Sequence, residues 1–583
     1  MYLDKINSPQ DLKKIPRNHL PQLCDEMRQA LLQKLSAHGG HAGPNLGMVE
    51  VTTALHYVFN SPVDKIVFDV SHQCYAHKML TGRMRAFTDP AHYDDVNGFT
   101  NPQESEHDIF TVGHTSTALS LACGLCKARD LMGQHHRVVA IIGDGSLSGG
   151  EAYEALNNVA EQNTGMIIVV NDNEMSIAEN HGGYYKNLEL LRETNGAAPH
   201  NIFKAMGLDY LYVPQGNDVL TMVEAFEKVK DTATPIVLHV HTQKGKGFAP
   251  AEQNREAFHS GGPFSLKTGK YVGGNGGESY NEITYKYLNK KMAEDASVVA
   301  ISSATPTIIG MTPERRIQAG KQFVDVGICE EHAVAFAAGI ARGGAKPVYA
   351  VFGSFLQRSF DQLHQDLALD NNPATVLVFW DSVYGMGGPT HNGLYDVAEI
   401  SNIPNLVYLA PTCVEEYLEM LDWSVEQEKL SVVIRVPYIV THGKQLGVDY
   451  GKLNKSQVVT HGQDVAIFAV GSFMQLGQDV VKRLKKQGVS ATLVNPVYLS
   501  GLDTELLDSL IANHRLVVTL EEGIVEGGYG QKIASYYGDK DIKVKNFGLV
   551  KSFFGDFDPD QLLKDNGLTV DNVSNYVINT LGK

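Results

Sequence analysis

A strand, helix and strand pattern between residues 137 and 173 constrains the fold of this chain most strongly. The β-rich run RVVAII leads into GDG at 143–145, and after the amphipathic stretch EAYEALNNVAEQN a second β-rich run, MIIVV, leads into NDN at 171–173. A crossover of this kind joins parallel strands, and ligands bind at the carboxyl ends of such strands. We therefore expect an α/β fold with a ligand beside both polar motifs.

The length of 583 residues predicts several domains rather than one hydrophobic core. A glycine-rich polar stretch at 271–283 indicates a boundary near 277, and a second polar stretch indicates one near 446. Strands and helices alternate on both sides of each boundary. The predicted domains are 1–277, 278–446 and 447–583.

Charge and composition exclude several classes of partner. A formal net charge of −17 and a pI near 5.7 argue against general nucleic-acid binding, which depends on clustered Lys and Arg. No apolar run reaches the roughly 18 residues of a membrane span, and the first residues resemble no signal or transit peptide. Six scattered cysteines predict free thiols, with Cys123 and Cys126 packed inside a helix. We expect a cytoplasmic enzyme without membrane or nucleic-acid partners.

The two polar motifs contain suitable ligands for a metal-bound diphosphate. Asp144 offers a carboxylate and Asn173 an amide oxygen, and 29 residues separate them, enough for the intervening helix to return the chain to the same sheet edge. Gly143 and Gly145 allow the backbone to approach a diphosphate closely. Mg²⁺ prefers oxygen ligands of this kind. A GDG alone is equally typical of a tight turn, and the NDN downstream favours the metal site.

This motif pair resembles the fingerprint of thiamine diphosphate enzymes. Further blocks, among them GGHAGPNLGMVE, FDVSHQCYAHKMLTGR, FTVGHTSTALS, EEHAVAFAAGIA and FLQRSFDQ, are similar to the 1-deoxy-D-xylulose-5-phosphate synthase family and occur in that family's order. The resemblance covers nearly the whole chain. It implies a homodimer with a three-domain, transketolase-like α/β architecture, each domain a mainly parallel sheet flanked by helices, that binds thiamine diphosphate and Mg²⁺. The three domains would bind the diphosphate (1–277), bind the pyrimidine (278–446) and form the carboxyl-terminal part (447–583).

The resemblance also assigns expected roles to individual residues. The expected catalytic residues are Glu330, His41, His72, His259 and His391. The expected cofactor contacts are His72, Gly113, His114, Thr115, Asp144, Gly145, Ser146, Asn173, Met175, Lys244, Glu330 and Phe355. The expected metal ligands are Asp144, Asn173 and the backbone oxygen of Met175, and the expected substrate contacts are His41, Arg358 and His391. Each histidine has a structural alternative, Phe355 suits core packing, and Lys244 suits an exposed glycine loop equally well. The glycine-rich run from Glu521 favours a structural turn or an interdomain contact over an anion site.

The chain departs from the family where that family recognises a triose phosphate with one Tyr and two Arg. Phe352, Ser382 and Tyr438 occupy those positions, although Arg358 is kept. Losing two charge-assisted contacts would weaken phosphate binding by about 10² to 10⁴-fold unless other residues substitute. These departures therefore concern the acceptor and leave the thiamine chemistry unchanged.

The leading hypothesis is decarboxylative condensation of pyruvate with an aldehyde, nominally D-glyceraldehyde 3-phosphate, giving 1-deoxy-D-xylulose 5-phosphate and CO₂. This product would supply isoprenoid or thiamine biosynthesis. The alternatives are a paralogue with another acceptor or a ketose donor, a dehydrogenase component of a 2-oxo acid complex, and a non-catalytic scaffold. Retention of Asp144, Asn173 and Glu330 argues against the scaffold.

Overall fold

The computed structural model describes residues 1–273 and 276–583. Residues 274 and 275 of the glycine-rich stretch lie outside the described residues. The chain forms two compact units, one of residues 1–276 with 327–329 and one of 277–326 with 330–583. The first unit ends beside the boundary expected near 277. The boundary expected near 446 falls inside the second unit, and it stays a prediction.

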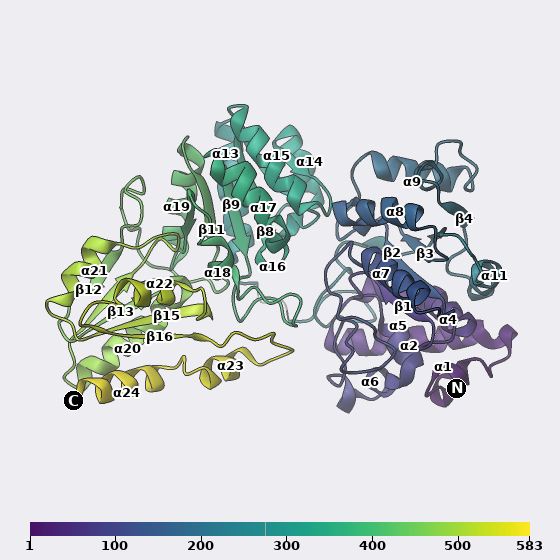
Figure 1. Cartoon of the computed structure of the whole chain (residues 1–583), viewed down its shortest axis with the longest axis horizontal. Coiled ribbons are helices and arrows are strands. Elements are labelled where there is room, and N and C mark those ends of the chain that lie inside the picture. The colour runs from purple at the N-terminus through teal and green to yellow at the C-terminus, as the bar shows by residue number, and fades with distance from the viewer. Residues whose placement is uncertain (274–275) are drawn as a thin grey trace. The chain divides into compact units, whose positions relative to one another are not determined.

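The first unit contains a five-stranded, wholly parallel sheet in the order β1-β2-β3-β5-β4. The predicted crossover is present as β2, α8 and β3. Strand residues alternate between two cores: Val139 and Ile141 face the layer that contains α2, α4 and α11, whereas Val138 and Ala140 face the layer that contains α7 and α8. Both faces are apolar, which explains the continuous hydrophobic runs in the sequence. Figure 1 shows this unit in purple to blue.

The elements of the first unit have the following bounds. Its strands are β1 (Lys65–Phe68), β2 (Val138–Gly143), β3 (Ile167–Asp172), β4 (Asp209–Val213) and β5 (Ile236–His241). Its helices are α1 (Pro9–Leu12), α2 (Leu20–His38), α3 (Ala42–Gly47), α4 (Val49–Val58), α5 (Tyr75–Lys78), α6 (Arg85–Thr88), α7 (Ala118–Leu131), α8 (Gly150–Gln162), α9 (Gly183–Glu193), α10 (Ile202–Ala205), α11 (Val219–Val229) and α12 (Ala249–Gln253). Cys123 and Cys126 are buried on α7, as expected.

The second unit contains two sheets. The first is parallel throughout, in the order β10-β11-β9-β8-β6-β7. Its strands are β6 (Val298–Ser302), β7 (Phe323–Asp325), β8 (Lys346–Phe352), β9 (Thr375–Phe379), β10 (Leu406–Leu409) and β11 (Ser431–Arg435). Its helices are α13 (Tyr280–Glu294), α14 (Pro313–Ala319), α15 (Glu330–Arg342), α16 (Gly353–Leu356), α17 (Phe360–Gln362), α18 (Asp396–Ile400) and α19 (Val414–Glu426).

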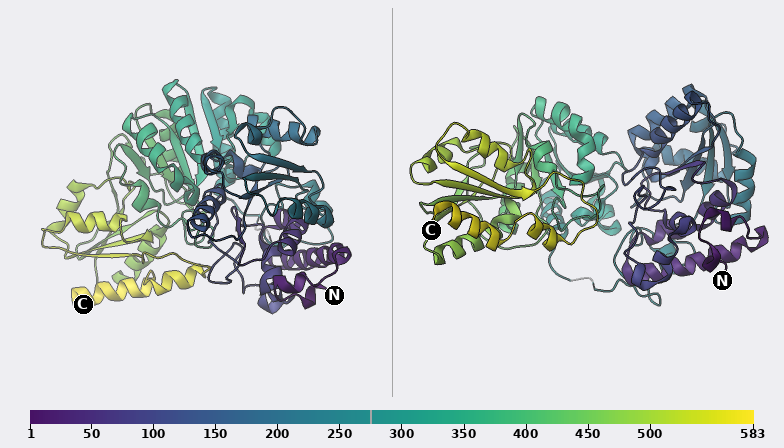
Figure 2. Two further views of the ribbon diagram at one scale, coloured as in Figure 1. Left: turned by 45° about the vertical axis from the view of Figure 1, so that its right-hand side comes forward. Right: turned by 60° about the horizontal axis from the view of Figure 1, so that its bottom comes forward.

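The other sheet of this unit has the order β12-β14-β13-β15-β16, and only the β12–β14 pair is antiparallel. Apolar residues of α20 and α24 cover one of its faces. Figure 2 shows the ribbon in two further views, with these last elements in green to yellow. Its strands are β12 (Gln457–Thr460), β13 (Val465–Ala469), β14 (Ala491–Asn495), β15 (Leu516–Ile524) and β16 (Lys543–Leu549). Its helices are α20 (Met474–Lys486), α21 (Thr504–Ile511), α22 (Tyr529–Tyr536), α23 (Pro559–Asp565) and α24 (Val570–Leu581). The predicted α/β class with mainly parallel sheets is confirmed. Among the helices described, none is long and apolar enough to cross a membrane.

Candidate active site

Two neighbouring strands deliver Asp144 and Asn173 to one edge of the first sheet. β2 and β3 pair in parallel with Gly143 opposite Asn171, so the residues after each strand leave the sheet together. The backbone N–H of Asp144 donates to the carbonyl of Asn171 at 3.0 Å. Both side chains are buried, with 1% of Asp144 and 9% of Asn173 exposed.

The buried oxygens of these side chains fit a hard cation. Asp144 accepts one hydrogen bond from Asn180 Nδ2 at 2.7 Å, and Asn173 Oδ1 has no hydrogen-bond partner among the described residues. Burial raises the pKa of Asp144 well above its ordinary value, and the nearby Asp172 carboxylate raises it further. A divalent cation would stabilise both the charge and the orphaned amide oxygen. No group of three His, Cys, Asp or Glu side chains suited to a metal occurs within the described ranges, so a cation at Asp144 needs amide, carbonyl or non-protein oxygens as well.

Asp172, the middle residue of the NDN motif, has a structural partner instead. Its carboxylate lies 2.5 Å from Arg192 Nη1 and 2.8 Å from His239 Nε2. Burial raises the pKa of Asp172, but His239 and Arg192 outweigh burial and hold that pKa below its ordinary value. Sequence reasoning missed this buried cluster, because its members are far apart in the chain.

Glycine at position 145 allows the loop after β3 to approach the loop after β2. A Cβ on Gly145 would lie 2.6 Å from Ser176 Cβ, closer than carbon atoms without a bond between them can pack. Ser146 is buried, and its carbonyl accepts from Ser116 Oγ at 2.8 Å. Met175 directly precedes Ser176. The expected contacts Gly145, Ser146 and Met175 therefore share one cluster of loops, and their ligand roles stay predictions.

Three of the expected catalytic histidines gather in the first unit. The ring centroids of His41 and His72 are 5.1 Å apart, those of His72 and His259 are 5.1 Å apart, and those of His41 and His259 are 5.8 Å apart. Lys244 Nζ donates to the carbonyl of Ser176 at 2.6 Å and lies 3.1 Å from His259 Nδ1. Lys244 is only 1% exposed, so it is not a surface charge.

This cluster favours uncharged imidazoles. Burial, together with the charge of Lys244, lowers the pKa of His41 to about 4 and that of His259 well below its ordinary value. Burial lowers the pKa of Lys244 itself to about 7, against the opposing effect of Asp144. Near neutral pH, His41 and His259 can therefore accept a proton or donate a hydrogen bond through their neutral rings.

Backbone contacts hold the histidines in place. Asn45 Nδ2 donates to the carbonyls of His41 and His72, each at 2.7 Å. Gly40 and Gly261 form an antiparallel bridge that brings the His259 segment to the start of α3. Sequence reasoning missed Asn45, although the GGHAGPN block contains it.

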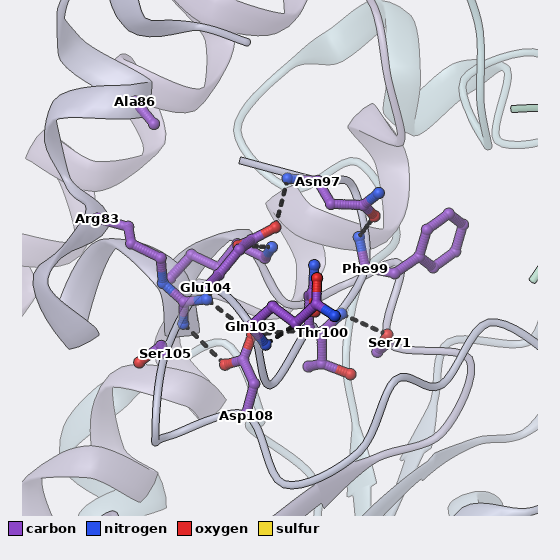
Figure 3. A network of polar contacts seen from close by, with 12 residues as sticks. Ser71, Arg83, Ala86, Asn97, Phe99, Thr100, Gln103, Glu104, Ser105 and Asp108 are labelled. Atoms are coloured by element: carbon purple, nitrogen blue, oxygen red, sulfur yellow. Dashed lines mark hydrogen bonds and ion pairs between the residues drawn. The ribbon is translucent and has the colours of Figure 1, made fainter. Parts of the chain in front are cut away.

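A loop at 97–108 places an aromatic ring against His41. The ring centroids of Phe99 and His41 are 5.6 Å apart. Figure 3 shows how the loop is fixed: Arg83 binds Asp108 through two contacts of 2.7 and 2.8 Å and Glu104 through one of 3.2 Å. Lys78 Nζ adds a contact of 2.6 Å to Glu104. The sequence did not predict this buried anchor.

The residues Gly113, His114 and Thr115 lie in the loop before α7. Asp69, which follows β1, accepts from the backbone N–H groups of Ser116 at 2.9 Å and Ala118 at 3.1 Å. The loop is therefore tied to the carboxyl end of β1, at the edge of the sheet that also presents Asp144. The cofactor contacts of these three residues stay predictions.

In the second unit, Glu330 begins α15 and is 2% exposed. Burial raises the pKa of Glu330 to about 7, although Arg358 opposes the rise. Arg358 Nη1 lies 3.4 Å from Glu330 Oε2. The expected substrate ligand Arg358 thus contacts the expected catalytic acid, and its substrate role stays a prediction.

Phe355 and His391 meet edge to face, with ring centroids 5.7 Å apart. The expected ring-stacking residue and the fourth expected histidine therefore share one surface of the second unit.

The glycine-rich run after β15 is a structural turn, as favoured above: the Glu521 carboxylate accepts from the backbone N–H groups of Tyr529 at 2.8 Å and Gly530 at 3.0 Å. A side chain of the protein thus occupies the start of α22, which leaves no anion site there.

Three family models match most of the chain. The family model described as 1-deoxy-D-xylulose-5-phosphate synthase matches residues 3–198 and 192–242. Models of the transketolase pyrimidine binding domain and the transketolase C-terminal domain match residues 278–440 and 454–573.

Curated relatives match over nearly the full length. The 1-deoxy-D-xylulose-5-phosphate synthase of Caldanaerobacter subterraneus subsp. tengcongensis is 37% identical over 619 aligned positions, which cover 99% of this chain and 98% of the relative. The 1-deoxy-D-xylulose-5-phosphate synthase 1 of Geobacter metallireducens is 39% identical over 91% of both chains. The synthase of Symbiobacterium thermophilum is 38% identical, over 98% of this chain and 94% of its own.

Proposed function

Because this chain belongs to the 1-deoxy-D-xylulose-5-phosphate synthase family, we propose that it condenses pyruvate with an aldehyde on thiamine diphosphate. The C1–C2 bond of pyruvate breaks, its carboxylate leaves as CO₂, and C2 forms a bond to the aldehyde carbon. One proton is taken up as the aldehyde oxygen becomes a hydroxyl. The nominal acceptor is D-glyceraldehyde 3-phosphate, which gives the product in the relatives' name. When bound, thiamine diphosphate supplies the nucleophilic carbon and the electron sink for this reaction.

The buried pair of Asp144 and Asn173 is the observation that carries this proposal. Asp144 supplies a carboxylate, Asn173 an orphaned amide oxygen, and Met175 a backbone oxygen from the same loop cluster. We assign these three as ligands of a Mg²⁺ ion that binds the cofactor's diphosphate. Gly145 and Ser146 would contact the diphosphate through their backbone.

Glu330 has the properties of an acid that protonates the cofactor's pyrimidine ring. With a pKa of about 7, its carboxyl is half protonated at neutral pH. The carboxyl can therefore share a proton with a ring nitrogen, because neither its protonated form nor its ionised form carries a large energetic penalty at neutral pH. Phe355 and His391 lie beside each other in the same unit and would contact the ring and the substrate respectively.

The three clustered histidines suit proton transfer at substrate oxygens. His41 and His259 are neutral near pH 7 and lie within a buried group, so water competes little for their hydrogen bonds. With a pKa of about 7, Lys244 is partly protonated near neutral pH, and its ammonium form, next to His259, can stabilise negative charge that develops nearby.

Further properties follow from family membership alone. We propose that the protein is a homodimer that acts in the cytoplasm and that its product enters isoprenoid or thiamine biosynthesis. Sedimentation of the purified protein tests the dimer, and a dominant monomer at micromolar concentration would contradict it.

The direct test uses pyruvate with an isotope label at its carboxyl carbon, C1, and measures the release of labelled CO₂ by the purified protein with thiamine diphosphate and Mg²⁺. We expect release to require an aldehyde and the product to carry the acetyl carbons of pyruvate by mass spectrometry. A matched reaction with a lipoylated protein in place of the aldehyde separates this activity from that of a 2-oxo acid dehydrogenase component. Absence of release with every aldehyde would refute the proposal.

A further inference from the structure

The chain returns to Asp144 once more after the NDN motif. Residues 174–180 fold back on themselves, because Met175 and Glu179 form an antiparallel bridge. Within this turn, Ser176 Oγ donates to a backbone carbonyl two residues further on, at 3.2 Å. The turn brings Asn180, which belongs to neither polar motif, into contact with the side chain of Asp144.

Side chains from outside the turn hold it in place. Lys244 Nζ donates to the carbonyl of Ser176 at 2.6 Å, and Arg255 Nη1 donates to the carbonyl of Asn173 at 3.2 Å. Ser176 also packs against Gly145 so closely that a Cβ on this glycine would collide with it. The turn therefore has a defined position beside the GDG loop.

The two ends of the Asn180 amide have different surroundings. Nδ2 donates to Asp144 Oδ2 at 2.7 Å, whereas Oδ1 is buried and has no hydrogen-bond partner within residues 1–273 and 276–583. Asn173 Oδ1 is buried in the same way. A buried amide oxygen without a donor destabilises a fold. Two such oxygens in the loops around one carboxylate therefore indicate a ligand that brings donors.

A hydrated Mg²⁺ ion brings donors of this kind. Mg²⁺ keeps several of its waters when it binds to protein carboxylates, and those waters donate hydrogen bonds to nearby acceptors. A neutral amide suits position 180. A lysine or arginine there would pair with Asp144 and compete with the cation, and a second carboxylate would repel Asp144 before the cation arrives.

The hydrogen bond from Asn180 also restricts how Asp144 can turn. The last torsion of an aspartate is broad, so a carboxylate without partners presents its oxygens in many orientations. Asn180 engages Oδ2 and does not compete for Oδ1. Mg²⁺ demands near-ideal octahedral geometry, so a carboxylate that is already oriented binds it more tightly.

The helix after the turn makes a second contact with the GDG loop. α9 begins three residues after Asn180, and Tyr185 on this helix donates from its hydroxyl to the carbonyl of Gly145 at 3.2 Å. Asn180 and Tyr185 thus engage consecutive residues, Asp144 and Gly145. The segment that follows the second polar motif therefore supports the first one.

We propose that Asn180 is a positioning residue of the cation site: it orients the Asp144 carboxylate for Mg²⁺ and accepts a hydrogen bond from a water on the cation. The inference rests on the proposed function, in which this cation binds the cofactor's diphosphate. Asn180 acts through Asp144 and through water, so its loss should weaken Mg²⁺ binding without abolishing it.

The test measures the dissociation constant of Mg²⁺ by calorimetry, at saturating thiamine diphosphate, with the full-length protein first freed of both. Asn180→Leu keeps a side chain of similar size and removes both the donor and the acceptor. We expect Mg²⁺ to bind about tenfold or more weakly. In the CO₂ release assay, excess Mg²⁺ should restore most of kcat, which it would not do for a damaged fold. Asn180→Ala carries the same expectation if leucine is not accommodated.

Asn187→Leu is the matched control. The Asn187 side chain donates to the carbonyl of His200 at 2.8 Å and accepts from the backbone N–H of Ile202 at 3.2 Å. This variant also loses structural hydrogen bonds, but at the start of α10 and not at the GDG loop. It should leave the affinity for Mg²⁺ unchanged. An equal loss in both variants, or no loss in Asn180→Leu, would overturn the inference.

A double variant shows whether Asn180 acts through Asp144. If it does, Asp144→Asn and Asn180→Leu together should weaken Mg²⁺ binding by less than the product of their separate effects. Effects that multiply in full would mean that the two side chains act independently, which contradicts the inference. If Asp144→Asn alone leaves the affinity unchanged, the metal site of the proposed function fails and the inference with it. If Asp144→Asn weakens binding and Asn180→Leu does not, only the inference fails.

Discussion

Replacing Glu330 by Gln should stabilise the apoprotein in a way that depends on pH. Burial raises the pKa of Glu330 from 4.5 to about 7, and each pKa unit corresponds to about 1.36 kcal/mol. Below pH 4.5 the carboxyl is protonated in both folded and unfolded chains, so it has no effect on the free energy of unfolding. Between pH 4.5 and 7 the unfolded chain ionises first, and stability falls. Above pH 7 the full penalty, about 3 kcal/mol, is present.

Gln removes this penalty because it never ionises. We expect the variant to exceed the parent chain in free energy of unfolding by about 3 kcal/mol at pH 8 and by little at pH 4. Urea unfolding of the cofactor-free protein at both pH values measures this, provided that the transition of the second unit is followed separately. The same variant should lose pyruvate consumption by about 10²-fold or more, because the ring nitrogen loses its acid.

The neighbouring residue supplies the control. Glu331→Gln changes the same functional group one residue along α15, where the side chain is only half-buried, and should alter stability by about 0.5 kcal/mol or less. The same stability change for Glu330→Gln at pH 4 and pH 8 would contradict the raised pKa of this buried acid, and normal turnover of the variant would contradict its catalytic assignment.

Three further predictions concern the first unit. Asp144→Asn should weaken Mg²⁺-dependent cofactor binding by about tenfold or more, measured by calorimetry, and an unchanged affinity would remove Asp144 from the metal site. Arg83→Met should lower the free energy of unfolding by about 3 to 5 kcal/mol and speed hydrogen exchange in loop 97–108, because the Asp108 carboxylate is then buried without its main partner. The control is Arg85→Met, at a side chain that is 70% exposed, which should change neither quantity. Burial lowers the pKa of His41 from 6.5 to about 4, so the free energy of unfolding should fall as pH decreases from 6.5 to 4, because the unfolded chain takes up a proton on His41 before the folded chain does. His41→Asn should flatten this part of the pH profile of stability, and an unchanged profile would contradict the buried neutral ring.

The sequence by itself determined the parallel pairing of β2 with β3 and the place of the two polar motifs at the ends of these strands. Continuous apolar runs of strand length around an amphipathic helix specify parallel pairing, and parallel pairing brings Asp144 and Asn173 to one edge. These are local patterns with short connections, so physical rules about neighbouring elements suffice. The resemblance then supplied the family, which the curated relatives confirm.

Only the tertiary structure decided the environments of individual charges. Lys244 lies in a glycine loop that looks exposed in sequence, yet contacts with Ser176 and His259 bury it. The pairing of Glu330 with Arg358, the anchoring of loop 97–108 by Arg83, and the hydrogen bond from Asn180 to Asp144 all join residues distant in the chain. Burial and partner charge fix the pKa of a side chain, and both depend on long-range packing that no local pattern contains.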